Sequence, residues 1–456
     1  MAYQAPVNVM ISLDTATSAR QSFGYPLFIA SHRYFPERVR VYNSLEAVQD
    51  DVPTGSPAYK ALSAALSATP RPSFVYLGRR EADASLAPQA VAVGKVYTVT
   101  VTVNDGDSVA VSYTAASGNT AQDVATALKT AIDANAAVNA HVGTAVVGTG
   151  ASATLTIKAT TAADVFSLSN VSANINVSYT STEAAGDVLA AVEEENTDWY
   201  SVSAEDHTEA FILAMAKAVE ARNKVYATSF AGAANLVATA DPIAAGDIAS
   251  KLKPYFRTFS IFHELADTEF PEMGYVGKFL PYAVGTENWE MKQLAGFDIS
   301  RDPSTLKKLT VTQKNVLVSK NVSYIENQGG LAVVRGGKVG ANEWIDTIRL
   351  RDAIEDEVRA NITDLLIRSS KMAYTDFGTN KVVGALSTAF NQFVETEQRP
   401  GGLEAGTPYK IFTTPAANIP TAKKAQRLLD SVSFVAYLAG GLSIVEIRGS
   451  LTYSGT

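Results

Sequence analysis

The chain of 456 residues contains no cysteine, which excludes disulfide bonds, thiolate metal sites and cysteine nucleophiles. Charge is also sparse, since 18% of the residues are charged and 46% are hydrophobic. This composition is typical of a folded chain and not of a disordered one. The length exceeds one ordinary core, so we expect about two or three domains.

Basic residues are fewer than acidic ones, 38 against 46, which leaves a formal net charge of −8. Binding to duplex nucleic acid requires a basic surface that neutralises phosphates, so we expect no nucleic-acid partner. Long apolar runs are missing too, because the nearly uncharged stretch 431–445 is split by Gly440 and Gly441 and is shorter than the roughly 20 residues of a membrane helix. The N-terminus shows no basic start followed by an apolar block, so we expect neither a secretory signal nor a membrane partner.

Signatures of catalysis and metal binding are also missing. The four histidines stand far apart, in none of the spacings of zinc sites, and there is no Gly-x-Ser-x-Gly elbow. The glycine-rich string 328–340 is not a phosphate loop, because Val339 stands where Ser or Thr would hold Mg²⁺. The carboxylate run 193–195 is interpreted as a solvated linker. We predict no catalytic, cofactor-binding or metal-binding residues and no enzymatic activity.

Apolar strands alternate with amphipathic helices over much of the chain, which predicts an α/β (α+β) multidomain fold. A strand at 23–30, a helix at 56–66 and a strand at 73–78 open the pattern, and it resumes after residue 199. Consecutive units of this kind favour a partly parallel sheet with helices on its faces. We therefore predict a core built on a mixed sheet.

The composition changes between residues 88 and 185, where Ala, Thr, Ser and Val dominate. Residues 97–103 alternate strictly between apolar and polar, a hairpin turn signal follows at 104–106, and a helix with one apolar stripe is expected at 120–134. This pattern indicates a small, separate β-rich domain inserted into the core.

The last third of the chain is predicted to hold a long helix at 342–368 and another at 382–397. A short amphipathic helix follows at 421–430, with Lys423, Lys424 and Arg427 as its basic positions. Such a helix could dock on an acidic partner surface, where charge sets register and encounter rate. The alternative is an ordinary solvated helix face.

Extended segments are expected at both ends of the chain. Residues 7–13 read as a lone strand, and 431–456 read as a β-hairpin with nothing of its own to pack on. Unpaired strand edges are templates for other chains, so both ends are expected to add strands to neighbouring molecules. The predicted domains are an arm at 1–20, core at 21–87, the inserted domain at 88–185, core at 186–430 and an arm at 431–456. The predicted arm positions are Val7, Val9, Ile11, Leu13, Phe434, Val445, Ile447, Leu451 and Tyr453.

Several segments together carry a resemblance to a known family. They are 7–13 leading to Phe23-Gly24, 74–78, Trp199-Tyr200, 340–346, 374–378 and 436–449. In their order and spacing, the chain resembles the tail sheath proteins of contractile-tailed bacteriophages, in a subgroup described as a domain of unknown function.

The resemblance implies a sheath core around a tail tube, an inserted domain that projects outward, and terminal arms that add strands to adjacent subunits. It implies a subunit that polymerises helically in stacked rings, and that contracts to drive the tube through the host envelope for genome delivery. The implied partners are other copies of the chain, the tail tube protein, and baseplate and tail terminator proteins. The implied location is the virion tail, assembled in the host cytoplasm, and by position the helix at 421–430 would face the tube.

Two other functions stay open on the sequence. One is another phage tail component, such as a tube or baseplate protein. The other is an α/β enzyme or ligand-binding protein with a site at the strand ends, which a pocket lined by converging polar residues would favour.

Overall fold

The structure is a computed structural model that describes residues 22–441, and these residues form two compact units. The large unit consists of Ser22–Ala283 and Glu287–Ile348, and the small unit of Val284–Thr286 and Arg349–Gly441. This division differs from the predicted core segment 186–430, because the residues after Arg349 pack around an apolar cluster of their own.

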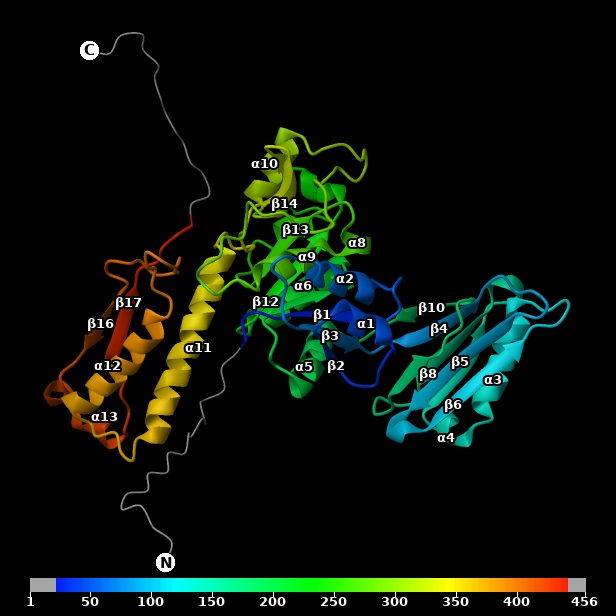
Figure 1. Cartoon of the computed structure of the whole chain (residues 1–456), viewed down its shortest axis with the longest axis horizontal. Coiled ribbons are helices and arrows are strands. Elements are labelled where there is room, and N and C mark those ends of the chain that lie inside the picture. The colour runs from blue at the N-terminus through cyan, green and yellow to red at the C-terminus, as the bar shows by residue number, and fades with distance from the viewer. Residues whose placement is uncertain (1–21, 442–456) are drawn as a thin grey trace, which may run out of the picture. The chain divides into compact units, whose positions relative to one another are not determined.

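The large unit is built on an eight-stranded sheet in the order β15-β14-β13-β12-β11-β1-β3-β2 (Figure 1). The pairs from β14 to β3 are parallel, whereas β15 and β2 pair antiparallel at the two edges. The predicted mixed sheet is therefore confirmed. The strands are β1 (Pro26–Ser31), β2 (Val39–Tyr42), β3 (Val75–Arg80), β11 (Ser201–Ala204), β12 (Val225–Phe230), β13 (Thr258–Phe262), β14 (Ser323–Gln328) and β15 (Leu331–Arg335).

Helices cover both faces of this sheet, each over its own apolar cluster. One face carries α1 (Leu45–Asp51), α2 (Pro57–Leu66), α8 (Ala266–Glu269) and α9 (Pro271–Phe279); the other carries α5 (Ala185–Glu195), α6 (Glu209–Glu220), α7 (Ile248–Lys251) and α10 (Val311–Ser319). Helices α2 and α9 approach so closely that a Cβ atom on Gly277 would lie 2.5 Å from the Cα of Ala65. Only glycine fits there without a shift of the backbone.

Each edge of the large sheet is capped at one position by another part of the same chain. At the β2 edge, the Glu195 carboxylate accepts hydrogen bonds from the backbone N–H groups of Arg38 at 3.0 and 2.9 Å and of Val39 at 3.2 Å. At the β15 edge, Val334 exchanges two backbone hydrogen bonds with Met291 and Lys292. The interpretation of 193–195 as a solvated linker is therefore wrong, because these residues form the last turn of α5 and Glu195 caps the sheet edge.

The inserted domain runs from β4 to β10, residues 83–180. Its two sheets have the orders β10-β4-β8-β7 and β6-β5-β9, and α3 packs its apolar stripe onto their shared core. Its elements are β4 (Asp83–Pro88), β5 (Val96–Val103), β6 (Ser108–Thr114), α3 (Ala121–Asp133), α4 (Ala136–Asn139), β7 (Val142–Val147), β8 (Thr154–Ala159), β9 (Phe166–Ser169) and β10 (Ile175–Thr180).

The small unit holds most of α11 (Ile345–Arg368), then α12 (Asp376–Asn391), β16 (Tyr409–Thr413), α13 (Thr421–Ala425) and β17 (Val432–Ala436). Helix α12 starts before the predicted 382–397, because the Thr375 side chain caps its N-terminus by accepting from the N–H of Gly378. It also ends earlier, because Leu403 forms a bridge with Val394, accepting from the Glu395 N–H and donating to the Phe393 carbonyl.

Candidate functional site

The small unit contains a sheet of only two strands. Strands β16 and β17 pair antiparallel, from Tyr409 opposite Ala436 to Thr413 opposite Val432. Within residues 22–441, no third strand joins them, and the outward edges of 409–413 and 432–436 make no other backbone hydrogen bond. A two-stranded sheet is marginally stable by itself in water, and its open edges carry unpaired N–H and C=O groups.

One face of this small sheet is held by α12. The Phe390 side chain is fully buried, with its ring centroid 4.8 Å from that of Tyr409 and 4.7 Å from that of Phe434. Leu386 on α12 and Leu350 on α11 belong to the same apolar cluster. The sheet is thus anchored by a helix while its edges stay open.

Large apolar side chains of the small sheet remain exposed. Phe412 is 53% exposed, Val435 46% and Leu438 50%. Exposed apolar side chains gathered beside unpaired strand edges mark a surface that another chain covers. The two strands and these side chains therefore form the candidate assembly surface, which we call the open sheet.

The structure places one of the predicted arm residues. Phe434 lies in β17, where it pairs with Ile411 of its own chain. The prediction that the segment from residue 431 has nothing of its own to pack on is wrong for 432–438, because β17 pairs with β16 and Leu438 pairs with Leu403. The other predicted arm residues lie outside the described residues: Val7, Val9, Ile11, Leu13, Val445, Ile447, Leu451 and Tyr453.

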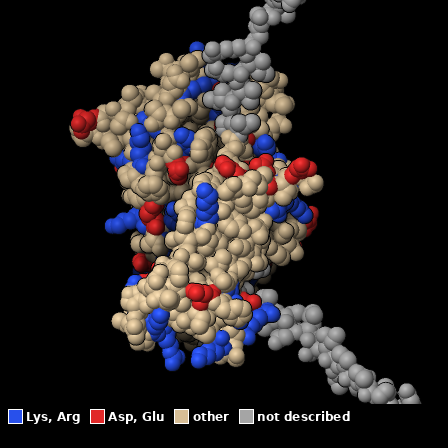
Figure 2. Space-filling model, turned by 90° about the vertical axis from the view of Figure 1, so that its left-hand side faces the viewer, with Lys and Arg blue, Asp and Glu red and all other residues tan. Residues whose placement is uncertain are grey.

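The basic positions predicted to face a partner lie at and after α13. The helix is shorter than the predicted 421–430, because Arg427 adopts a left-handed φ of 56°. The Lys423 ammonium lies 2.5 Å from the Asp430 carboxylate, and this hydrogen bond and charge raise the pKa of Lys423. Lys424 and Arg427 form no ion pair among the described residues. Figure 2 shows several Lys and Arg side chains together at the lower end of its view.

A pocket of about 520 Å³ lies at the carboxyl ends of β1, β3 and β11. Its charged groups have partners: Arg80 pairs with Asp206 at 2.9 Å, His207 bonds Glu272 at 3.1 Å, and the Glu205 carboxylate accepts from the Ser31 backbone N–H at 2.8 Å. Burial alone would lower the pKa of His207, but Glu272 and Asp267 reverse this and raise it to about 10. This arrangement is that of a structural ion-pair network, and it does not favour the ligand-binding alternative.

Two further observations concern metal binding and membrane-spanning helices. No group of three or more His, Asp or Glu side chains in residues 22–441 is arranged to hold a metal ion. In the same part of the chain, every helix is too short or too polar to cross a membrane.

No protein-family model and no curated protein matches the chain. Among solved structures, a chain in the cryo-EM structure of the anti-feeding prophage baseplate has a TM-score of 0.52 at 11% identity, over 99% of this chain and 100% of that one. The contracted helical sheath of the same prophage has a TM-score of 0.49 at 11% identity, covering 98% and 99%. The sheath tail protein of Listeria innocua has a TM-score of 0.46 at 9% identity, covering 87% and 90%. The first similarity shows that this chain shares the fold of a component in the prophage baseplate structure.

Proposed function

We propose that the chain is a structural subunit of a contractile phage tail sheath, without enzymatic activity. It polymerises helically around the tail tube and contracts to drive the tube through the host envelope for genome delivery. The observation that carries the proposal is the open sheet, in a chain that shares its fold along 99% of its length with a component in the anti-feeding prophage baseplate structure. The resemblance seen in the sequence supports it.

The open sheet is the acceptor for the terminal arms of neighbouring subunits. Residues 7–13 and 445–453 have the apolar alternation of strands. Each backbone hydrogen bond contributes about 0.5–1.5 kcal/mol net, so one added strand of several residues resists separation by several kcal/mol. Such a connection holds subunits together while their larger bodies slide and rotate.

The same contacts explain a helical arrangement. An arm on one surface and an acceptor on another make a heterologous contact, and heterologous contacts that do not close generate helical arrays. The partners are then other copies of this chain along the array, the tail tube protein inside it, and baseplate and tail terminator proteins at its ends. The array belongs to the virion tail and is assembled in the host cytoplasm.

Lys423, Lys424 and Arg427 face the tube in this proposal. Lys424 and Arg427 carry charges that no acidic side chain neutralises among the described residues, which suits an acidic partner surface. Reversing both charges, with Lys424→Glu and Arg427→Glu, is expected to weaken co-sedimentation with tail tubes and leave self-assembly unchanged.

The decisive experiment removes the C-terminal arm and keeps β17. A chain ending at residue 441 retains the complete small unit, whereas a cut at 431 would delete an internal strand. We expect the full chain to sediment as polymers and the shortened chain to be a folded monomer. Unchanged polymerisation of the shortened chain would contradict the proposal.

A matched pair of variants tests the strand pattern of the arm. Val445→Asp with Ile447→Asp places charges on the apolar positions and is expected to block polymerisation. Glu446→Gln with Arg448→Gln changes the alternate positions and is expected to leave polymerisation intact. Equal effects of the two pairs would show that the arm does not act as a strand.

A baseplate component is the second candidate, because the structure with a TM-score of 0.52 is that of a baseplate. The two functions differ in the length of the assembly. A sheath subunit forms cylinders of many stacked rings, whereas a baseplate component forms a single ring or none.

A further inference from the structure

The inserted domain joins the core through two short connections that lie side by side. Glu81 and Ala82 link β3 to β4, and residues 181–184 link β10 to α5. Strands β4 and β10 pair along their whole length, with Asp83 opposite Thr180, so both connections leave the domain at one place. Two adjacent connections without further contacts would let the domain pivot.

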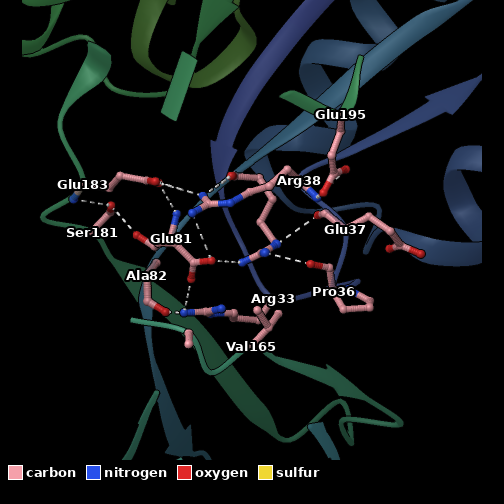
Figure 3. Close-up of polar contacts among 12 residues, drawn as sticks. Arg33, Pro36, Glu37, Arg38, Glu81, Ala82, Val165, Ser181, Glu183 and Glu195 are labelled. Carbon is pink, nitrogen blue, oxygen red and sulfur yellow. Dashed lines mark hydrogen bonds and ion pairs between the residues drawn. The ribbon is translucent and has the colours of Figure 1, made fainter. Parts of the chain in front are cut away.

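A cluster of buried and partly buried charges surrounds these connections (Figure 3). The Glu81 carboxylate lies 2.6 Å from Arg33, 2.6 Å from Arg79 and 3.4 Å from Arg38. Arg38 also lies 2.9 Å from Glu183 on the second connection. The Arg79 side chain is 1% exposed and that of Arg33 3%.

The two connections also bond each other directly. The Glu81 backbone N–H donates to the Glu183 carboxylate at 2.6 Å, and the Ser181 hydroxyl donates to the Glu81 carbonyl. The Arg80 Nε, at the end of β3, donates to the Glu183 carbonyl at 2.9 Å. The outgoing and returning chains are therefore tied together at the exit from the core.

A third segment of the core reaches into the inserted domain. The Arg33 Nε donates to the Ala82 carbonyl at 2.8 Å, and its guanidinium lies 4.2 Å from the centroid of the buried Phe166 ring. The Arg33 carbonyl accepts a hydrogen bond from the Leu168 N–H on β9 at 2.6 Å. Tyr34 then packs edge-on against Tyr179 on β10.

The acidic and basic groups of the cluster keep their charges at neutral pH. Burial raises the pKa of Glu81, but the guanidiniums of Arg79, Arg33 and Arg38 outweigh it and lower the pKa. Burial lowers the pKa of Arg33 to about 10, which still leaves it protonated. A planar guanidinium pairs with a carboxylate in a fixed geometry, and removing the Glu81 carboxylate would leave the buried guanidiniums of Arg33 and Arg79 without it.

We propose that Arg33, Arg38, Arg79, Glu81 and Glu183 lock the inserted domain to the core, so that the two move as one rigid body. This coupling does not depend on the proposed function. One consequence of the coupling rests on the proposed function: in a contracting sheath, the inserted domain would turn through the same angle as its core and would not swing separately.

The absence of cysteine makes the coupling directly measurable on the full chain. Thr126→Cys on α3 and Ala214→Cys on α6 are exposed positions that take a pair of spin labels, with no other thiol to react. Pulsed electron paramagnetic resonance then gives the distribution of distances between the inserted domain and the core. We expect one narrow distribution for the labelled parent chain. A broad or multiple distribution would overturn the proposal.

Substitutions in the cluster test whether it causes the narrow distance distribution. Arg33→Met and Glu81→Gln are each expected to at least double the width of the distribution. Lys320→Met, which breaks a buried ion pair with Asp247 inside the core at 2.8 Å, is expected to leave the width unchanged. An unchanged width in both Arg33→Met and Glu81→Gln would overturn the proposal. Equal broadening in the Lys320→Met control would also overturn it.

Glu81→Gln also covers the case in which Arg33→Met fails to fold, since glutamine keeps the shape of the side chain. The measurement uses the shortened chain ending at 441 as well as the full chain. That chain is expected to be monomeric, so the distance distribution within it tests the rigid coupling without sheath assembly. Failure of the coupling can therefore be distinguished from failure of assembly.

Discussion

The edge strands of the large sheet and of the open sheet differ in whether their outward backbone groups have hydrogen-bond partners. The eight-stranded sheet caps its β2 edge at Val39 with the Glu195 carboxylate, and its β15 edge at Val334 with backbone bonds to Met291 and Lys292. In the open sheet, the outward edges of strands 409–413 and 432–436 have no such partner among residues 22–441. Closed edges prevent unwanted pairing, and open edges permit pairing with another chain. Under the proposed function, the difference separates edges that the chain caps itself from edges that a neighbouring subunit would complete.

The largest expected effect comes from removing the anchor of the open sheet. Phe390→Ala deletes a fully buried ring that touches both strands, and such a change costs about 3–5 kcal/mol. We expect the small unit to unfold at a lower temperature while the large unit keeps its own transition, as seen by hydrogen exchange of each unit.

The matched control for this variant is on the same helix. Phe377 is 72% exposed, so Phe377→Ala is expected to change the unfolding free energy by less than about 0.5 kcal/mol. If the two alanine variants had the same effect, the small unit would not be anchored as described.

A smaller effect is expected from overpacking the large unit. Gly277→Ala forces a Cβ atom to within 2.5 Å of the Ala65 backbone, and overpacking typically costs about 1–3 kcal/mol. Gly186→Ala in α5 is the control, because no atom beyond its chain neighbours and its own helix backbone lies within 4 Å of the added methyl group, and replacing such a glycine typically stabilises by about 0.4–1 kcal/mol. Chemical denaturation of the large unit should give opposite signs for the two variants.

The smallest effect is expected from opening a closed edge. Glu195→Ala removes the acceptor for the N–H groups of Arg38 and Val39, which is expected to cost about 0.5–1.5 kcal/mol and to speed amide exchange at β2. Glu194→Ala, on the exposed neighbouring residue, is the control and should leave that exchange unchanged. Identical exchange in both variants would remove the distinction between the two sheets.

The mixed sheet and its helices could be predicted because their signals are local. The buried strand β1 is a continuous apolar run from Pro26 to Ala30, and a helix such as α3 carries a regular apolar stripe and a capping box at Thr120 and Asp123. Each of these signals is contained within one short stretch of the sequence.

The parts that could not be predicted depend on contacts between distant residues. The limits of α12 follow from the cap at Thr375 and from the pairing of Val394 with Leu403. The pairing of β17 with β16 brings together strands separated by α13, so the strand after 431 looked unpartnered in the sequence. The junction cluster joins Arg33, Glu81 and Glu183, and no local pattern connects these three residues.

Electron microscopy of the purified full-length chain in negative stain tests the central claim most directly. Subunits that complete one another's open sheets are predicted to build hollow, striated cylinders, and the chain ending at residue 441 is predicted to show only single particles. Cylinders formed equally well by the shortened chain, or a full-length chain that stays as single particles at every concentration, would contradict the account.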